Sequence, residues 1–275
     1  MSGSPHPSVP AAAPGGFAPA FVRSVLDAAL ARGGPVHAIA GLQGSGKSTL
    51  AAQLVAAAGA RGSRAVALSI DDFYLGRRER LRLGRTIHPL CATRGPPGTH
   101  DVALACEVLD ALAQGRPVRL PRFDKIADRR LPPSRWPRVH GIDLVVFEGW
   151  FLKVPAQSPD ELPAPLNRLE REEDPDGTWR RWANDALREA YPPLWARLPR
   201  LLFLQGPGFE RVGDWRWQQE CTLQAAHPRR QAMTRPQVLR FVEFFERVSR
   251  QALRTLPAIA QRTVRLDARR TPLAG

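Results

Sequence analysis

Gly41-Leu42-Gln43-Gly44-Ser45-Gly46-Lys47-Ser48 is the stretch that decides the fold of this chain, because it matches the pattern G-x-x-x-x-G-K-[ST] at every fixed position. An apolar run at 36–40 leads into it and predicts a strand, and a helix-forming run at 49–55 follows it. In such a loop, glycines let successive backbone N–H groups point into one concavity, and the next helix adds its positive N-terminal end. In this context the stretch predicts a phosphate-binding loop rather than a chance glycine-rich turn.

The polar residues of this loop predict its ligands. The Lys47 ammonium can reach the β- and γ-phosphates of a nucleoside triphosphate, and the Ser48 hydroxyl can ligate Mg²⁺. We therefore expect ATP and Mg²⁺ to bind here. The expected nucleotide-binding residues are Gly41, Gly44, Ser45, Gly46, Lys47, Ser48 and Thr49.

Short apolar runs alternate with helical stretches along the rest of the chain. Near-continuous apolar strands that alternate with helices are typical of a parallel sheet covered on both faces. We therefore predict an α/β fold of the P-loop NTPase type, with helices on both faces, a small lid segment, and functional residues at the carboxyl ends of the strands. The candidate strands are 36–40, 65–70, 142–147, 201–204 and 264–266, and the candidate helices include 20–32 and 102–112.

Composition favours one large domain. Residues 1–19 are rich in Pro, Ala, Gly and Ser and lack an apolar h-region, so we expect a disordered leader, followed by a single domain over 20–275. No apolar stretch approaches the ~20 residues that cross a bilayer, so we expect no membrane contact. Because the leader does not read as a signal peptide, we expect a cytoplasmic protein. The three cysteines, Cys91, Cys106 and Cys221, are scattered and predict neither a disulfide framework nor a zinc site.

The net charge of +14 at pH 7 raises the question of nucleic-acid binding. Only Lys47, Lys125 and Lys153 are lysines, and the arginines are spread along the whole chain without a basic block or interleaved aromatic residues. We therefore expect no nucleic-acid partner. Excess positive charge also suits a protein whose ligands carry phosphate and carboxylate groups.

Two regions interrupt the alternation of strands and helices. Residues 152–176 carry several prolines and a charged stretch at 170–174, which predicts a solvated excursion without a functional role. Residues 206–235 contain Gly206-Pro207-Gly208 and the dense segment 214–220, which predicts a mobile cover over the site, a lid.

Two aspartates follow the second candidate strand, in Ser69-Ile70-Asp71-Asp72-Phe73-Tyr74. In a doubly wound sheet this end faces the phosphate loop, where a carboxylate can accept the proton of an acceptor hydroxyl or hold Mg²⁺. Adjacent aspartates also often cap the segment that follows them. The phosphate loop one strand earlier favours chemistry, and the string by itself leaves open which aspartate is the base.

An acid also ends the third strand, in Phe147-Glu148-Gly149-Trp150. An acid after an apolar strand is a Walker-B-like arrangement, which would place Glu148 near the magnesium ion of the nucleotide. An acid that merely ends the strand is the alternative.

The segment Thr93-Arg94-Gly95-Pro96-Pro97-Gly98-Thr99-His100-Asp101 concentrates polar donors on a rigid turn before a helix. It predicts the wall of a small polar substrate pocket, although Thr99 or His100-Asp101 can at the same time cap the helix that starts at Val102. Lys125, a lysine in a chain that otherwise uses arginine, suggests a point-charge role.

Arg216 lies between two tryptophans in the expected lid. Enzymes that transfer a phosphoryl group need cationic side chains to neutralise the charge that develops on that group, and a closing lid can deliver one. A surface arginine without such a role is the alternative.

The order of the motifs along the chain resembles that of the D-glycerate 3-kinases of the plant and bacterial type. These motifs are the phosphate loop, the Asp-Asp-Phe-Tyr string, 94–101, Phe123-Asp124-Lys125, 147–150 and 215–220. These kinases belong to the wider group of phosphoribulokinase, uridine kinase and pantothenate kinase. The resemblance runs from about Phe21 to about Arg270, so it implies that 20–275 is a P-loop kinase domain with its lid at about 206–235.

The resemblance implies transfer of the γ-phosphoryl group of ATP to the 3-hydroxyl of D-glycerate, with Mg²⁺ as the cofactor. A carboxylate substrate would explain a guanidinium in the pocket, since the two groups form two parallel hydrogen bonds. The implied catalytic residues are Lys47, Asp71 as the base, Glu148 and Arg216; the implied metal ligands are Ser48, Asp71 and Glu148; and the implied substrate-binding residues are Asp72, Tyr74, Arg94, His100, Asp101 and Lys125.

The chain departs from the family pattern in two places that border the expected acceptor site. Phe151-Leu152-Lys153-Val154 replaces the Cys or small residues and glycine that often follow Glu-Gly-Trp, and the stretch after Lys125 is short and lacks glycines. The acceptor therefore stays open between glycerate and another hydroxyl compound of the pantothenate or nucleoside type. Two alternatives belong to different functional classes. One is an ATPase or nucleotide-dependent switch without a small acceptor, and the other is a nucleic-acid-binding module.

Overall fold

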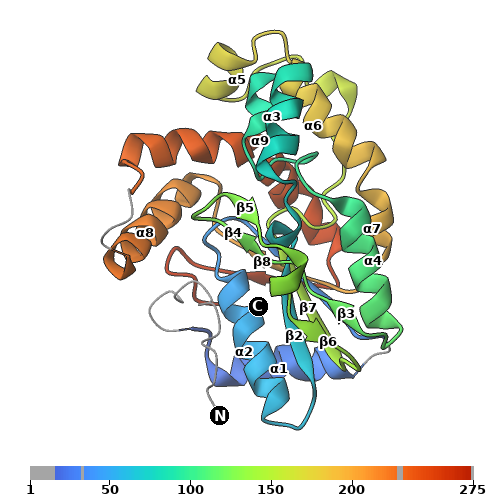
Figure 1. Ribbon diagram of the computed structural model, residues 1–275. Helices are drawn as coiled ribbons and strands as arrows, with labels where there is room; N and C mark the ends of the chain where they lie inside the picture. The colour runs from blue at the N-terminus through green and yellow to red at the C-terminus, as the bar shows by residue number, and fades with distance from the viewer. Residues whose placement is uncertain (1–15, 32–33, 228–231, 274–275) are drawn as a thin grey trace.

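Five parallel strands form the central sheet, in the order β2-β7-β1-β8-β9 (Figure 1). The computed structural model describes residues 16–31, 34–227 and 232–273. Two small antiparallel pairs, β3 with β6 and β4 with β5, lie outside the sheet. The strands are β1 (Val36–Gly41), β2 (Ala65–Ser69), β3 (Val118–Arg119), β4 (Phe123–Asp124), β5 (Arg129–Arg130), β6 (Arg138–Val139), β7 (Leu144–Gly149), β8 (Leu201–Gln205) and β9 (Arg262–Arg265).

Apolar side chains point alternately to the two faces of the sheet along each strand, which divides the hydrophobic core into two layers. On β7, Val145 and Phe147 pack into one hydrophobic cluster while Leu144 and Val146 pack into the other, and β1 and β8 alternate in the same way. Successive side chains of a strand point to opposite faces, so a strand that is apolar throughout must be covered on both. This confirms the predicted parallel sheet with helices on both faces.

Helices α1 and α2 cover one face of the sheet, and α4, α7 and α9 supply apolar side chains to the other (Figure 1). Apolar residues recur at helical spacing on α1, where Val22, Val25, Leu26 and Ala29 are buried. The helices are α1 (Pro19–Leu30), α2 (Lys47–Gly59), α3 (Arg77–Thr86), α4 (Val102–Ala113), α5 (Arg168–Glu173), α6 (Thr178–Glu189), α7 (Pro192–Ala196), α8 (Glu210–Ala226) and α9 (Arg235–Ile259).

The predicted strands and helices are present with small shifts of their ends. The third strand of the sheet begins at Leu144 rather than at 142. Within the predicted leader, residues 1–15 lie outside the described residues. Phe17 is buried and its backbone N–H and C=O both bond the Gln53 side chain, at 2.9 Å each, so the fold begins before position 20.

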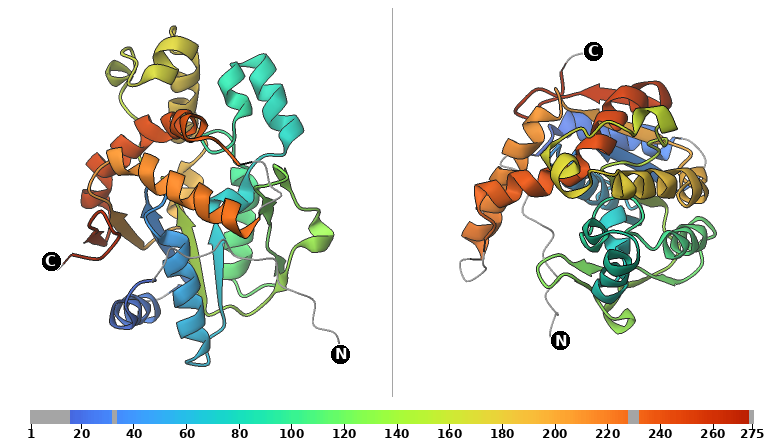
Figure 2. Two further views of the ribbon diagram at one scale, coloured as in Figure 1. Left: turned by 90° about the vertical axis from the view of Figure 1, so that its left-hand side faces the viewer. Right: turned by 90° about the horizontal axis from the view of Figure 1, so that it is seen from above.

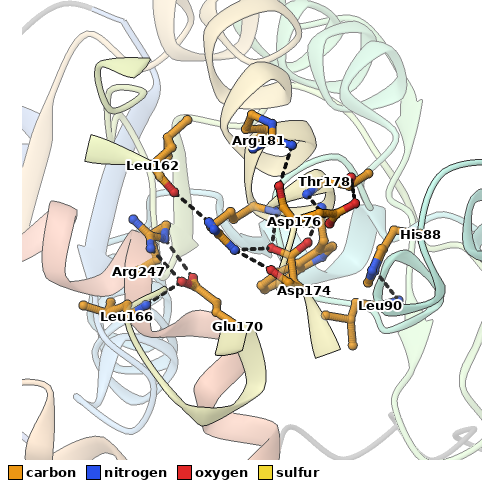
Figure 3. A network of polar contacts seen from close by, with 12 residues as sticks. His88, Leu90, Leu162, Leu166, Glu170, Asp174, Asp176, Thr178, Arg181 and Arg247 are labelled. Carbon is orange, nitrogen blue, oxygen red and sulfur yellow. Dashed lines mark hydrogen bonds and ion pairs between the residues drawn. The ribbon is translucent and has the colours of Figure 1, made fainter. Parts of the chain in front are cut away.

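The prediction of a solvated excursion over 152–176 was wrong for part of its charged stretch: Arg171, Glu172 and Glu173 are exposed, but the two end residues of 170–174 are buried. Glu170 and Asp174 are 1% and 0% exposed. Glu170 accepts hydrogen bonds from Arg247 of α9, and Asp174 accepts one from Arg180 of α6 at 3.0 Å (Figure 3). A buried carboxylate is tolerated only with a paired charge and further hydrogen bonds. These pairs fasten the segment to two helices of the main domain.

The region 206–235 contains α8, which follows β8 at the carboxyl edge of the sheet. Figure 2 shows α8 beside the first half of α9, with both helices projecting together from the sheet. Trp215 of α8 is buried, and its indole N–H donates to the Ala268 carbonyl at 3.0 Å.

No helix in the described part of the chain is long and apolar enough to cross a membrane.

Candidate active site

The phosphate loop connects the carboxyl end of β1 to the first turn of α2. Gly44 needs to be glycine, because its φ is +80° and a Cβ there would lie 2.5 Å from the Cβ of Trp215. Lys47 opens α2, and its Nζ donates to the Leu42 carbonyl at 3.2 Å. Burial lowers the pKa of Lys47, and the neighbouring Glu148 carboxylate opposes that shift.

The other expected nucleotide-binding residues lie in the same loop and helix turn. Gly41 ends β1, and the Ser45 hydroxyl is buried without a hydrogen-bond partner among the described residues. Gly46 is the N-cap of α2, and Ser48 and Thr49 follow in its first turn. A buried polar group that has no partner within the protein can still be paired by a ligand or an ordered water.

Glu148 and Ser48 meet beside this loop. Glu148 lies opposite Ile39 of β1 and Ser69 of β2 in the sheet register. Its carboxylate is 6% exposed and accepts a hydrogen bond of 2.7 Å from the Ser48 hydroxyl. The two groups that the sequence predicts as magnesium ligands are therefore adjacent.

The two oxygens of Ser48 and Glu148 fit Mg²⁺. No group of three or more His, Cys, Asp or Glu side chains that could hold a metal is found in the described residues. Mg²⁺ is usually bound by one or two protein oxygens together with substrate phosphates and water. Ser48 and Glu148 supply two such oxygens at the phosphate loop.

Asp71 lies in the short 3-10 helix that follows β2, and its carboxylate is held by two donors. Tyr74 Oη donates to Oδ1 at 2.7 Å, and Lys125 Nζ donates to Oδ2 at 2.6 Å. Burial alone would raise the pKa of Asp71, but Lys125 and Tyr74 outweigh it and hold that pKa well below its usual range. Asp71 is therefore an ionised acceptor that also interacts electrostatically with Lys47.

Asp72 has a structural role at the same turn. Its carboxylate accepts a hydrogen bond from Ser69 N at 3.1 Å, which with the Ser69 hydroxyl forms a capping box. Arg122 also donates to it, at 3.3 Å. Burial raises the pKa of Asp72 although Arg122 opposes the shift. The capping role expected for adjacent aspartates thus falls on Asp72, while Asp71 contacts Lys125 and Tyr74.

His100 lies against the Asp71 turn, because its segment runs antiparallel to residues 73–75. Leu75 N donates to the Thr99 carbonyl at 2.9 Å, and Asp101 N donates to the Phe73 carbonyl at 2.7 Å. The His100 and Tyr74 rings are 4.8 Å apart between centroids. Burial lowers the pKa of His100 to about 4, so the ring is neutral at physiological pH.

Arg94 and Lys125 meet at the hairpin formed by β4 and β5. Arg94 donates to the Asp128 carboxylate at 2.6 Å and to the Lys125 carbonyl at 3.0 Å. The buried Arg80 donates to the same Asp128 oxygen at 2.8 Å. Asp128 therefore ties the hairpin to the segment that bears Arg94, which brings two cationic side chains to the Asp71 side of the site.

Asp101 caps α4, with its Oδ1 accepting from Leu104 N at 3.1 Å. Its second oxygen accepts from Arg130 of β5 at 3.1 Å.

Arg216, on α8, forms an ion pair with Glu220 and lies 5.9 Å from the Phe241 ring centroid. The structure thus gives both expected site residues, Asp101 and Arg216, local partners, and their binding or catalytic roles stay predictions.

Three functional candidates were missed by sequence reasoning. Asp128 organises the hairpin, and Tyr191 contacts His100 Nδ1 at 2.7 Å. Arg270 donates to the Gly44 carbonyl of the phosphate loop at 2.6 Å and lies over the Trp215 ring. A signal for Tyr191 exists in the composition: the chain has only two tyrosines, and both contact His100.

Known proteins of similar sequence are kinases. No family model matches the chain. It is 32% identical over 218 residues to a Schizosaccharomyces pombe protein named "Uncharacterized kinase mug58", a match that covers 75% of this chain and 76% of that protein. It is 36% identical over 128 residues to the "Probable ATP-dependent kinase TDA10" of Saccharomyces cerevisiae, covering 41% of this chain and 43% of that protein.

Solved structures agree with these relatives. D-glycerate 3-kinase from Cryptococcus neoformans superposes with a TM-score of 0.71 at 25% identity, covering 93% of this chain and 96% of that one. The structure of the YGR205w protein superposes with a TM-score of 0.67 at 26% identity, covering 93% of both chains. The resemblance that the motifs indicated is thereby confirmed. The chain belongs to the family of ATP-dependent P-loop kinases that includes mug58.

Proposed function

We propose that this kinase uses Mg²⁺ and transfers the γ-phosphoryl group of ATP to the 3-hydroxyl of D-glycerate. The observation that carries the proposal is the position of Asp71. Its carboxylate interacts with Lys47 of the phosphate loop and also binds Lys125 and Tyr74 directly. An ionised carboxylate thus interacts both with the lysine of the phosphate loop and with two further donors, which supports its assignment as the base.

The residues of the chain divide the work as follows. Asp71 accepts the proton of the acceptor hydroxyl as its oxygen attacks the γ-phosphorus, and the bond between that phosphorus and the ADP oxygen breaks. Lys47 neutralises the phosphates that it contacts. Ser48 and Glu148 would hold Mg²⁺, which would neutralise charge on the phosphates of ATP.

The acceptor side favours a small carboxylate. Three groups surround Asp71 and Tyr74: Lys125 donates to Asp71, Arg94 donates to the Lys125 carbonyl, and the neutral ring of His100 packs on Tyr74. A guanidinium and an ammonium bind carboxylate by charge-assisted hydrogen bonds. Similarity to the C. neoformans D-glycerate 3-kinase supports glycerate among such acids.

In this proposal α8 forms the lid expected at 206–235, of which residues 228–231 lie outside the described residues. Trp215 contacts the loop at Gly44, so the neighbouring Arg216 is carried by a helix that already touches the nucleotide site. Closure of α8 on bound ATP delivers the guanidinium to the transferring phosphoryl group.

A coupled ADP-release assay tests the proposal, with Mg-ATP and D-glycerate, L-glycerate, pantothenate, uridine or no acceptor. Stimulation by D-glycerate alone, with 3-phosphoglycerate identified by NMR, is the expected result. Turnover with a different acceptor would replace glycerate by that compound. Hydrolysis that no acceptor changes would overturn the acceptor site itself.

A further inference from the structure

Tyr191 immediately precedes α7 and contacts the His100 ring. The phenol ring is 0% exposed, and its centroid lies 6.0 Å from that of His100. Its oxygen lies 2.7 Å from His100 Nδ1 and 3.0 Å from the backbone nitrogen of Gly98. Tyr191 is therefore the link between a fixed backbone amide and the imidazole ring.

The direction of these hydrogen bonds follows from the chemistry of the donors. A backbone amide only donates, so the Tyr191 oxygen accepts from Gly98. Burial raises the pKa of Tyr191 well above its usual range, so the phenol keeps its proton and can donate it to Nδ1. Nδ1 is then the acceptor, and the single proton of the neutral imidazole lies on Nε2.

The Gly98 amide is held firmly enough to set this direction. Gly98 has a φ of +88°, and a Cβ there would lie 2.4 Å from the Trp182 ring. The turn is closed by Thr99, whose hydroxyl donates to the Pro96 carbonyl at 2.7 Å and accepts from Gly95 N at 3.0 Å. The loop therefore holds the Gly98 N–H at a fixed place. Because the Tyr191 oxygen accepts from this N–H, its own hydroxyl proton is directed towards His100.

His100 Nε2 is the end of this chain of hydrogen bonds. It is buried and has no hydrogen-bond partner among the described residues. Buried donors are nearly always paired in proteins, and an unpaired one at a site is typical of a group that awaits a ligand. The ring packs on Tyr74, whose hydroxyl binds Asp71.

We propose that Tyr191 is a positioning residue that fixes His100 as the Nε2–H tautomer, so that His100 donates a hydrogen bond to an oxygen of the phosphoryl acceptor. The inference rests on the proposed function, because it needs an oxygen-bearing acceptor beside Asp71. It adds an uncharged, directional donor to the cationic side chains of the pocket. Such a donor discriminates between acceptors by the position of an oxygen rather than by charge alone.

The tautomer can be measured on the protein without substrate. In a protein labelled with ¹⁵N-histidine, two-bond ¹H–¹⁵N correlation distinguishes a protonated Nε2 from a protonated Nδ1, and H100Q identifies the His100 signals. We expect Nε2–H in the wild type at pH 7 and a mixture of both tautomers in Y191F. A wild-type ring protonated on Nδ1 would overturn the proposal, whatever the enzyme phosphorylates.

Kinetics test the consequence for the acceptor. Y191F should raise the KM for the acceptor about tenfold, the usual worth of a hydrogen bond, and leave the KM for ATP unchanged. W195F is the matched control, because Trp195 packs on Tyr191 and Phe151 but makes no hydrogen bond to His100. An equal rise in W195F would reduce Tyr191 to packing and overturn the proposal.

A double-mutant cycle separates positioning from general damage. H100Q keeps an N–H near the place of Nε2 and has no tautomer to fix, whereas H100N keeps one only near Nδ1. We expect H100Q to retain a lower acceptor KM than H100N, and Y191F to add less than twofold in the H100Q background. A full tenfold loss in that background would contradict the inference. If another acceptor replaces glycerate, the same cycle is measured with that acceptor.

Discussion

Lys125 Nζ lies 2.6 Å from Oδ2 of Asp71, although the two residues are 54 positions apart in the chain. Asp71 is placed by the end of β2, and Lys125 by the hairpin of β4 and β5. The lysine keeps the carboxylate ionised and bonds its Oδ2, while Tyr74 bonds its Oδ1. An acceptor hydroxyl that transfers its proton to Asp71 must therefore share the carboxylate with these two donors, which makes the pair of Asp71 and Lys125 a direct target for mutagenesis.

Asp71→Asn should lower kcat by about a hundredfold or more while ATP binding stays nearly unchanged, because the amide cannot accept the hydroxyl proton. Steady-state kinetics and a nucleotide-binding titration measure the two effects. Asp72→Asn is the control: its carboxylate caps the turn, so it should lose stability and change kcat less than tenfold. The opposite pattern, with near-normal turnover in D71N, would make Asp72 the base.

Lys125→Met should shift the acidic limb of the pH profile of kcat/KM to higher pH. Lys125 holds the pKa of Asp71 below its usual range, so its removal lets that carboxyl protonate at a higher pH and lose activity there. Lys153→Met is the matched control, because Lys153 donates to the Leu198 carbonyl and has no contact with Asp71. Superimposable acidic limbs in wild type and K125M would show that Asp71 ionisation does not limit the rate.

Arg94→Ala should raise the KM for the acceptor by about ten- to a hundredfold, as expected when a charged hydrogen bond to a carboxylate is lost. The KM for ATP should change little. Arg122→Ala offers a control of similar exposure, 29% against 26% for the side chain, because Arg122 also pairs with an aspartate but contacts Asp72. A larger effect on ATP than on the acceptor would move Arg94 into the nucleotide site.

Local sequence patterns were sufficient to predict the residues that form the framework of the site. The phosphate loop, the aspartates after β2 and Glu148 at the end of β7 are each read from fewer than about ten consecutive residues, and a parallel sheet brings strand ends to one edge. The hydrogen bond between Ser48 and Glu148 confirms that convergence. Sequence reasoning works here because each residue is placed by the strand next to it.

Side-chain contacts between elements that are distant in the sequence could not be predicted from the sequence. The acids at 170–174 look solvated locally, and only the fold brings Arg180 and Arg247 to them. Tyr191 reaches His100 across 91 residues of sequence, and no period or motif encodes that contact. Charge pairing and tautomer control are tertiary properties, so they appear only once the elements have packed.

His37, on β1, gives a stability prediction that is independent of the active site. Burial, with Arg200 and Arg262 nearby, lowers the pKa of His37 to about 4, from 6.5 in the unfolded chain. Between these two values the unfolded state binds more protons than the folded state, so this contribution to stability is present above pH 6.5 and is lost as the pH falls towards 4.

Urea denaturation at pH 7 and pH 4.5 measures the effect. His37→Gln cannot take up the proton, so its loss of unfolding free energy between the two pH values should be smaller than that of the wild type by roughly 2 kcal/mol. His140→Gln removes an exposed histidine and should leave the wild-type loss unchanged. Equal losses in H37Q and the wild type would mean that His37 does not stay neutral inside the fold, and that the sheet tolerates a charged ring beside Arg200 and Arg262.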